Sequence, residues 1–312
     1  MTQAPTPTPD TVRQLVRSLL KDGTADGAGP EITPVTEGGE HATWWVGSRH
    51  VLRLASNRAA TVRQRRELRL RDLVRPYLPV AVPASVAHGE WAPGLTYTLD
   101  TKLPGRSGED QDVSAVGEAD LAGLLTGLRE VPTRQTEALG IPRTAPRSLE
   151  ELRRAAEQAA ERLAAADEFD AARLLQLTQA GAIQLAAQTG TAALVHHDLK
   201  GEHLVVSTDG RVRGVLDWTD ATLGDPAEDI AGLALAVGSP AAVRAATLAG
   251  YGARPCLRGL WLARCDTVVR LADSLKGRDA GPVPLLRTQL RRTWEAILLE
   301  RVTELRDGEG EL

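Results

Sequence analysis

The sequence predicts an α+β protein in which a small mixed lobe precedes a larger, mainly helical lobe. Strand-like runs separated by turn residues dominate the chain up to about residue 103. Segments rich in Ala, Leu, Glu and Arg at helical spacing dominate from about residue 112 onward. The composition changes at Leu103-Pro104-Gly105. We therefore expect an N-terminal lobe at residues 1–103 and a C-terminal lobe at residues 104–312.

The first lobe should be a small antiparallel sheet with one helix packed on it. A helix is expected at residues 10–21, capped by Asp10 or Thr11. Strands are expected at 32–35, 42–46 and 50–54, the last two joined by a Gly47-Ser48-Arg49 hairpin. A charged helix at 58–74 precedes two more strands, at 82–88 and 95–102.

The second lobe should consist of helices interrupted by one short strand region. Helical spacing covers residues 115–129 and 149–187 and returns from Pro226 to the end. Between these helices, residues 193–218 read as a region of strands and loops. Its last strand, at 212–216, follows a Thr208-Asp209-Gly210 turn.

The bulk composition excludes several classes of partner. The 312 residues are 42% hydrophobic, which suffices for a sizeable core, and the net charge is -4 with the basic residues spread along the chain. No apolar run is long enough for a signal or a membrane span. Two cysteines, Cys256 and Cys265, disfavour a disulfide framework. We expect a cytoplasmic monomer or dimer that binds neither nucleic acid nor membrane.

The residues that carry chemistry lie between Leu194 and Trp218. An apolar strand leads into a polar loop that holds Asp198, and the following hairpin ends at Asp217. Phosphoryl transfer needs one carboxylate beside the attacking hydroxyl, and a second that shares a Mg²⁺ ion with one more ligand. Asp198 fits the first role and Asp217 the second. His203 stands where the additional metal or phosphate contact is expected.

The same residues also fit an ordinary turn. Asp favours the ends of loops, and a buried His often only satisfies a hydrogen bond, so His196-x-Asp198 alone is weak evidence. The second carboxylate, Asp217, follows the hairpin and is itself followed by Gly224-Asp225-Pro226-Ala227-Glu228-Asp229. This combination favours catalysis.

The passage LVHHDLKGEHLVVSTDGRVRGVLDWTDATLGDPAEDIAGLAL resembles the signature of the aminoglycoside and macrolide phosphotransferases. The usual pattern in that family is H-G-D-x-x-x-x-N, then I-D-W or I-D-F, then D-P-x-x-D. The likeness is specific here, closest to the macrolide group, and weaker over about residues 32 to 240. It implies a protein-kinase-like bilobal fold, ATP or GTP as donor, Mg²⁺, and a small-molecule hydroxyl acceptor such as an antibiotic.

The resemblance assigns roles to the loop residues. It makes Asp198 the catalytic Asp that takes the substrate hydroxyl, Asp217 the metal-binding Asp, and His196 a largely structural histidine. It implies that Asp225 and Asp229 support the catalytic loop and cap the next helix.

Two positions depart from the family pattern. His203 stands where Asn is usual, and an imidazole suits hard Mg²⁺ less well than an amide oxygen. His197 replaces the common Gly, which places a polar side chain near the substrate.

The resemblance also orders the nucleotide site. Gly38-Gly39 would form a flexible loop over the phosphates, although a plain hairpin turn explains them nearly as well. Arg53 stands where the phosphate-binding lysine is usual, and Glu67 would be its acidic partner. The alternatives are an exposed strand Arg and an exposed helix charge. Asp100-Thr101-Lys102 falls at the hinge, whose backbone should bond the purine, so ATP against GTP stays open.

The acceptor pocket is the least determined part. A polycationic aminoglycoside would need carboxylates and a macrolide a broad apolar surface, and the second lobe offers both. The acidic candidates are Asp220, Glu228, Asp266 and Asp273, and the apolar candidates are Trp261, Leu262 and Trp294. Asp220 is the favoured acceptor-side carboxylate, with a structural role as the alternative.

Three functions are compatible with these residues. The first is an antibiotic O-phosphotransferase. The second is a metabolic kinase of the same fold that acts on an alcohol or sugar. The third is a non-catalytic binding protein, which predicts the loss of Asp198 or Asp217. Both carboxylates are present, so we expect an enzyme.

Overall fold

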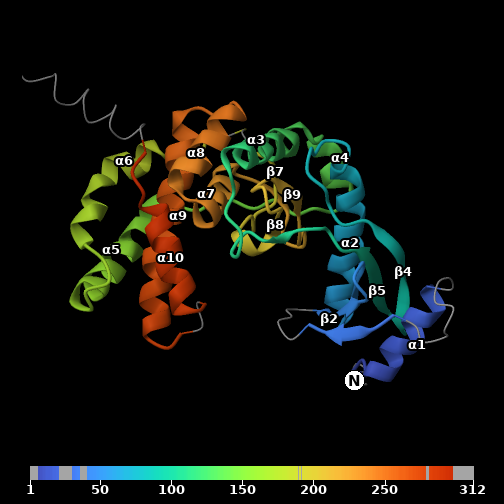
Figure 1. Cartoon of the computed structure of the whole chain (residues 1–312). Coiled ribbons are helices and arrows are strands. Elements are labelled where there is room, and N and C mark those ends of the chain that lie inside the picture. The colour runs from blue at the N-terminus through green and yellow to red at the C-terminus, as the bar shows by residue number, and fades with distance from the viewer. Residues whose placement is uncertain are drawn as a thin grey trace, which may run out of the picture.

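The computed structural model describes residues 6–20, 30–35, 41–188, 190, 192–278 and 281–297. The N-terminal lobe contains one five-stranded antiparallel sheet in the order β1-β2-β3-β5-β4, shown in Figure 1. Its strands are β1 (Ile32–Pro34), β2 (His41–Val46), β3 (His50–Ala55), β4 (Ser85–Ala92) and β5 (Leu95–Thr101). The predicted antiparallel sheet is therefore confirmed, while Gly38 and Gly39 lie outside the described residues.

A helix covers each face of this sheet. The side chains of Leu52, Leu54 and Leu99 form a core with Val12 and Val16 of α1 (Pro9–Leu19). Helix α2 (Arg58–Val74) packs against β3 and β5 on the other face. Because strand side chains alternate between faces, Arg53 and Asp100 point towards α2.

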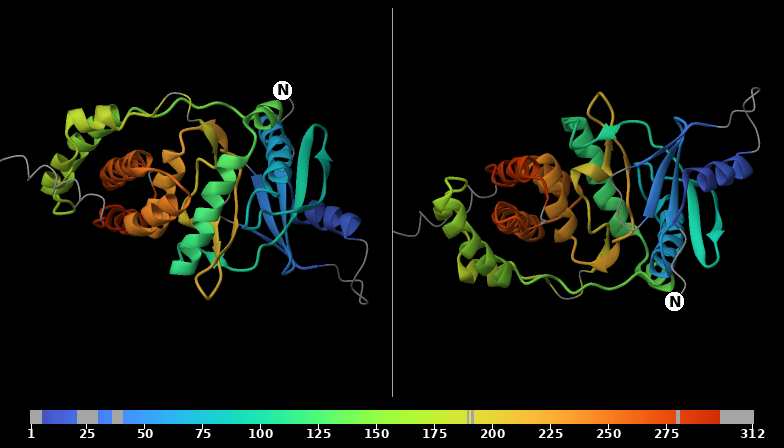
Figure 2. Two further views of the ribbon diagram at one scale, coloured as in Figure 1. Left: turned by 90° about the horizontal axis from the view of Figure 1, so that it is seen from above. Right: turned by 90° about the horizontal axis from the view of Figure 1, so that it is seen from below.

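The C-terminal lobe is mainly helical, with two small sheets. Strands β6 (Arg106–Ser107), β8 (Leu204–Val206) and β9 (Val212–Val215) form one sheet, and β7 (Ala193–Val195) pairs with β10 (Thr222–Gly224). The helices are α3 (Ala115–Glu130), α4 (Thr133–Ala138), α5 (Leu149–Ala165), α6 (Gln179–Gln184), α7 (Ala227–Val237), α8 (Ser239–Leu248), α9 (Ala253–Leu275) and α10 (Val283–Thr293). Figure 2 shows the large sheet towards one end of the molecule and α5 at the other.

The chain passes into the second lobe directly after β5. Strand β6 pairs with β8, so residues from Arg106 onward belong to the C-terminal sheet. The boundary after Leu103 remains an interpretation, because Ala81 also bridges to Gly214 of β9. No helix among the described residues is long and apolar enough to cross a membrane.

Three of the expected elements need correction. Thr8, not Asp10 or Thr11, caps α1, because its side chain accepts the Thr11 N–H. The strand expected at 82–88 begins only at Ser85. The helix expected at 149–187 is broken into α5, the 3₁₀ helix η1 (Ala171–Gln176) and α6, and Asp167 beyond α5 has a φ of 55°. A left-handed residue cannot continue an α-helix.

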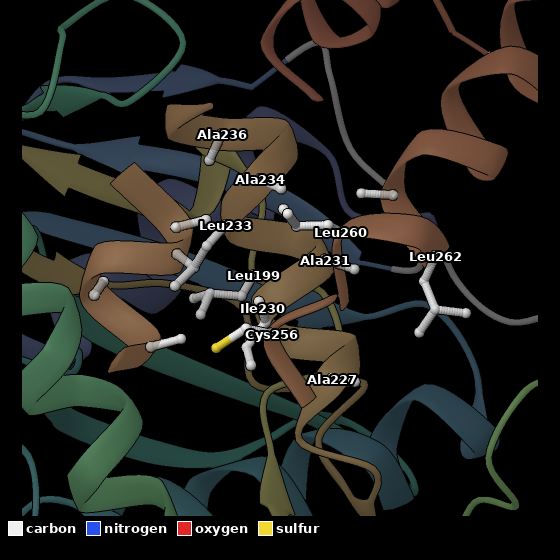
Figure 3. Packing of buried hydrophobic residues seen from close by; sticks show 14 of the residues in the cluster. Leu199, Ala227, Ile230, Ala231, Leu233, Ala234, Ala236, Cys256, Leu260 and Leu262 are labelled. Carbon is white, nitrogen blue, oxygen red and sulfur yellow. The ribbon is translucent and has the colours of Figure 1, made fainter. Parts of the chain in front are cut away.

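The loop that carries Asp198 packs closely against helix α7. Leu199 is completely buried and lies beside Ile230 and Leu233 of α7, as Figure 3 shows. A Cβ atom on Gly232 of α7 would lie 2.6 Å from the carbonyl oxygen of Leu199. Glycine at 232 therefore lets the loop that carries Asp198 rest directly on the α7 backbone.

We expect Gly232→Ala to displace the catalytic loop. The added methyl group would collide with a backbone carbonyl, which should cost roughly 1–3 kcal/mol of stability and reduce turnover. Chemical denaturation and enzyme assay measure both effects. Gly252→Ala is the matched control, because nothing lies within 4 Å of the Cβ position there. Equal stability and activity in the two variants would contradict this account.

Candidate active site at the junction of the two lobes

Two loops of the C-terminal lobe bring the predicted carboxylates together. Asp198 follows β7, and Asp217 follows β9 at the end of the β8–β9 hairpin. His203, in the 3₁₀ helix η2 (Gly201–His203), lies between them. Its Nδ1 is 3.4 Å from Asp198 Oδ2, and its Nε2 is 3.8 Å from Asp217 Oδ2. The predicted convergence of the loop and the hairpin is therefore present.

The loop that carries Asp198 is held in place by one buried carboxylate, that of Asp229. Asp229 on α7 accepts the backbone N–H groups of His196 and His197, each at 2.8 Å. Burial raises the pKa of Asp229 to about 7, although these two donors act in the opposite direction. Asp225 has the other expected role, because its Oδ1 accepts the Ala227 N–H at the start of α7. The structure thus divides support and capping between the two.

His196 fixes this loop to the segment that carries Asp217. Its ring is completely buried and its Nε2 lies 2.9 Å from the carbonyl oxygen of Leu216, the residue before Asp217. A carbonyl can only accept, so Nε2 carries the hydrogen. Burial, with a smaller contribution from His203, lowers the pKa of His196 to about 4 and keeps it neutral. The role of this histidine in the fold is structural.

The backbone at His197 explains why glycine is usual there. His197 has a φ of 69°, in the left-handed region that glycine adopts without strain. Its side chain is exposed. The loop tolerates this histidine because its N–H is held by Asp229. Contact of the imidazole with an acceptor stays a prediction.

The hydrogen bonding of His203 leaves one ring nitrogen available. Its Nδ1 is 2.7 Å from the backbone carbonyl oxygen of Asp198, so Nδ1 carries the hydrogen. The lone pair is then on Nε2, which is the atom nearer to Asp217 Oδ2. Among the described residues, no group of three or more His, Cys, Asp and Glu side chains could hold a metal ion. This pair therefore fits a cation only if phosphate or water supplies the remaining ligands.

Asp217 is held as a carboxylate in a strained position. Its φ is 54°, which is uncommon for a residue with a side chain. Burial would raise the pKa of Asp217, but Arg53, His203 and Thr219 together hold it below its ordinary value. A carboxylate that stays ionised beside an arginine suits a metal ligand or a phosphate-facing site.

The predicted Arg53–Glu67 pair is present. Arg53 Nη1 lies 2.7 Å from Oε1 and 2.9 Å from Oε2 of Glu67, whose side chain is 2% exposed. Burial opposes the charge on Arg53, but Glu67 outweighs it and raises the pKa of the guanidinium. Both residues are therefore inside the site and neither is an exposed surface charge. Contact of Arg53 with phosphates remains a prediction.

Polar groups of the expected hinge residues Asp100, Thr101 and Lys102 already have hydrogen-bond partners within the protein. The Asp100 carboxylate is buried and bonded by both terminal nitrogens of Arg71, at 3.1 Å each. The N–H groups of Thr101 and Lys102 donate to the carbonyls of Ala84 and Arg49. The Asp100 side chain is therefore structural, and the predicted purine contact is narrowed to other backbone groups of this segment.

Most acceptor candidates already have partners. Arg147 bonds both Glu228 and Asp266, with contacts of 2.7 Å to each. Asp273 pairs with Arg278 at 3.0 Å. Each of these three carboxylates pairs with an arginine in the fold, and a contact with the acceptor stays a prediction for them.

The apolar candidates are core residues. Trp261, Leu262 and Trp294 are all buried, and the Arg264 guanidinium lies 4.9 Å and 5.2 Å from the two indole rings. They are corrected to packing residues. Asp220 is exposed in the turn between β9 and β10. Its contact with the acceptor stays a prediction.

The sequence argument missed two residues of the site. Lys200 Nζ lies 3.2 Å from Asp198 Oδ2 and 2.7 Å from Glu202 Oε1. Its spacing two residues after Asp198 was a signal for it. Thr219 donates its hydroxyl to Glu67 Oε2 at 3.2 Å across the lobes, and no local pattern could have revealed that contact.

The fold and the grouping of Asp198, His203 and Asp217 are those expected of a kinase-like phosphotransferase. Residues 31–260 match the model of the Phosphotransferase enzyme family, and the chain belongs to that family. The chain is similar to viomycin phosphotransferase of Streptomyces vinaceus, at 34% identity over 28% of this chain and 36% of that protein. An uncharacterised Bacillus subtilis protein, YcbJ, is 48% identical over 13% of each chain. The chain thus spans little of either curated relative.

Solved structures share the fold over nearly the whole chain. The GDP and kanamycin complex of APH(2")-IIIa superposes with a TM-score of 0.63 and 18% identity, covering 95% of this chain and 98% of that one. Macrolide 2'-phosphotransferase MphH of Brachybacterium faecium gives a TM-score of 0.59 at 21% identity, covering 91% and 98%. These likenesses confirm the protein-kinase-like fold.

His196 should make stability depend on pH in a defined direction. Its pKa in the fold, about 4, lies below the unfolded value of 6.5, so the unfolded chain takes up the proton first as pH falls. The stabilisation is present above the unfolded pKa and is lost as pH falls towards the folded one. Relative to His196→Gln, the wild type should lose about 2 kcal/mol between about pH 7 and about pH 5.

The titration of Asp229 acts in the opposite direction and is present in both proteins. Its contribution therefore cancels when the free energy of unfolding of His196→Gln is subtracted from that of the wild type. Urea denaturation at each pH gives the two free energies of unfolding. A difference between the proteins that stays constant over this range would refute the buried neutral histidine.

Proposed function

We propose that this protein is an antibiotic O-phosphotransferase that moves the γ-phosphoryl group of ATP or GTP to a hydroxyl group. The observation that supports this most directly is the arrangement of Asp198 and Asp217 on either side of His203. In the N-terminal lobe, the pair of Arg53 with the buried Glu67 supplies an oriented cation. These are the groups that phosphoryl transfer requires.

Asp198 is the group that would receive the acceptor proton. Its side chain is 30% exposed, so a hydroxyl group can approach it. The hydroxyl oxygen forms a bond to the γ-phosphorus, the bond from phosphorus to the β–γ bridging oxygen breaks, and the proton passes to Asp198. The Lys200 ammonium holds the carboxylate in place. Burial opposes the charge on Lys200, but Glu202 and Asp198 raise its pKa.

Asp217 and His203 are the groups that would hold Mg²⁺. The carboxylate Oδ2 and the lone pair on Nε2 offer two ligands, and the phosphates of the nucleotide supply others. The ion, when bound, neutralises charge on the β- and γ-phosphates. Arg53, held by Glu67, would contact the same phosphates. We assign ATP or GTP as the donor, because related folds are described in complex with GDP and with ATP.

The acceptor class rests on the relatives. Similar folds belong to proteins described with kanamycin, gentamicin and streptomycin, to macrolide 2'-phosphotransferases, and local sequence similarity points to viomycin phosphotransferase. We therefore propose an antibiotic with a free hydroxyl as acceptor. Asp220, and the exposed imidazole of His197, are the proposed acceptor-side groups.

A substrate panel tests the proposal. The purified chain is incubated with Mg²⁺ and either ATP or GTP, and with aminoglycosides, macrolides and viomycin in turn. Mass spectrometry should detect a phosphorylated product in at least one class. Phosphorylation of none of them would sink the antibiotic assignment.

Asp198→Ala should abolish most of the turnover without preventing nucleotide binding. Loss of a positioned acid–base group costs about 10²- to 10⁴-fold in rate, and Asp198 has no predicted contact with the nucleotide. Steady-state assay and calorimetric titration separate the two effects. Asp209→Ala, which removes an exposed carboxylate of the β8–β9 turn, is the control and should keep its turnover. Near-normal turnover in Asp198→Ala would refute the base assignment.

His203→Asn should change the metal preference. An amide oxygen is a harder ligand than an imidazole nitrogen, so the ratio of Mg²⁺ to Co²⁺ affinity should move towards Mg²⁺ by roughly tenfold. Calorimetric titration of each ion into the nucleotide complex measures this ratio. An unchanged ratio would show that His203 is not a metal ligand.

A further inference from the structure

Thr219 makes a hydrogen bond that joins the two lobes at the active site. Its Oγ1 donates to Oε2 of Glu67 on α2 at 3.2 Å, although the two residues are 152 positions apart in the chain. Thr219 is half-buried, and Glu67 is 2% exposed. Water therefore has little access to Glu67, and the hydroxyl is not easily replaced as its partner.

The backbone of the same residue contacts Asp217. The Thr219 N–H also donates to Asp217 Oδ1, with the nitrogen 3.4 Å from that oxygen, at the long limit of a hydrogen bond, and Asp217 itself has a φ of 54°. Thr219 thus contacts two carboxylates. Its amide N–H contacts Asp217, which is proposed to bind metal, and its hydroxyl contacts Glu67 of α2.

Glu67 passes this constraint on to the phosphate-binding cation. Its two oxygens accept from Arg53 Nη1 at 2.7 Å and 2.9 Å. The position of the guanidinium is therefore set by where α2 holds Glu67. Any shift of Glu67 away from Thr219 would move Arg53 relative to Asp217.

We propose that Thr219 is a positioning residue that couples Arg53 to Asp217. Its hydroxyl fixes Glu67, and its N–H fixes the Asp217 carboxylate, so the two sides of the nucleotide phosphates are set to one geometry. This inference rests on the proposed phosphoryl transfer. It predicts that the metal-dependent part of nucleotide affinity depends on the Thr219 hydroxyl.

Three variants separate the hydroxyl from the shape of the side chain. Thr219→Val keeps the volume and loses the donor, and Thr219→Ser keeps the donor. Thr126→Val is the matched control, since it removes a half-buried hydroxyl that bonds the Ala122 carbonyl of α3, away from the site. Circular dichroism melting establishes that each variant is folded.

Calorimetry then measures the affinity for ATP with and without Mg²⁺. With Mg²⁺ present, Thr219→Val should bind ATP about tenfold more weakly than the wild type, while Thr219→Ser should recover most of the affinity. The loss should be smaller without Mg²⁺. A structural defect alone would weaken binding equally in both conditions, and that result would overturn the proposal, as would wild-type affinity in Thr219→Val.

A double-mutant cycle with Glu67→Gln tests the route of the coupling. If the hydroxyl acts through Glu67, Thr219→Val should cost little further affinity in the Glu67→Gln background. Additive losses would overturn the proposal. Because ATP binding needs no acceptor, these results stand even if the antibiotic panel fails. Failure of the wild type to bind nucleotide would instead refute the proposed function.

Discussion

The buried carboxylate of Asp229 is the interaction on which the arrangement of the site depends. It accepts the N–H groups of His196 and His197, two adjacent backbone donors that would otherwise be left without partners beneath the loop. With both donors fixed, the left-handed conformation at His197, the residue before Asp198, is maintained. The two hydrogen bonds offset the free-energy cost of burying Asp229, and they also hold His197 in its strained left-handed conformation.

Close packing and contacts between the lobes fix the other residues of the site relative to this loop. Gly232 lets the Leu199 carbonyl approach α7, so the catalytic loop is supported by backbone as well as by hydrogen bonds. His196 then ties the loop to the Leu216 carbonyl beside Asp217. In the N-terminal lobe, Glu67 accepts from Arg53 and also from Thr219 of the C-terminal lobe. Each part of the site is fixed by a contact with the next.

Residues with a strong local signature could be predicted from the sequence, and residues defined by distant partners could not. The Arg53–Glu67 pair was predictable because the family resemblance places Arg53 at the phosphate-binding lysine and Glu67 as its acidic partner. The ion pairs of Asp266 and Glu228 were not, because Arg147 reaches them from 119 and 81 positions away. The break after α5 was also missed, since its alanine-rich flanks are helical in propensity and Asp167 adopts a left-handed conformation instead.

Local patterns in the sequence predicted most of the strands and helices and the loop positions of Asp198 and Asp217, and the family resemblance implied the reaction class. These follow from periodicity and from short motifs, in which neighbouring residues carry the information. Only the tertiary structure decided the tautomer of His203, the occupancy of the acceptor-side carboxylates, and the bond from Thr219 to Glu67. The physical reason is that hydrogen bonding and burial depend on which groups meet in space, and 152 residues separate the two ends of that bond.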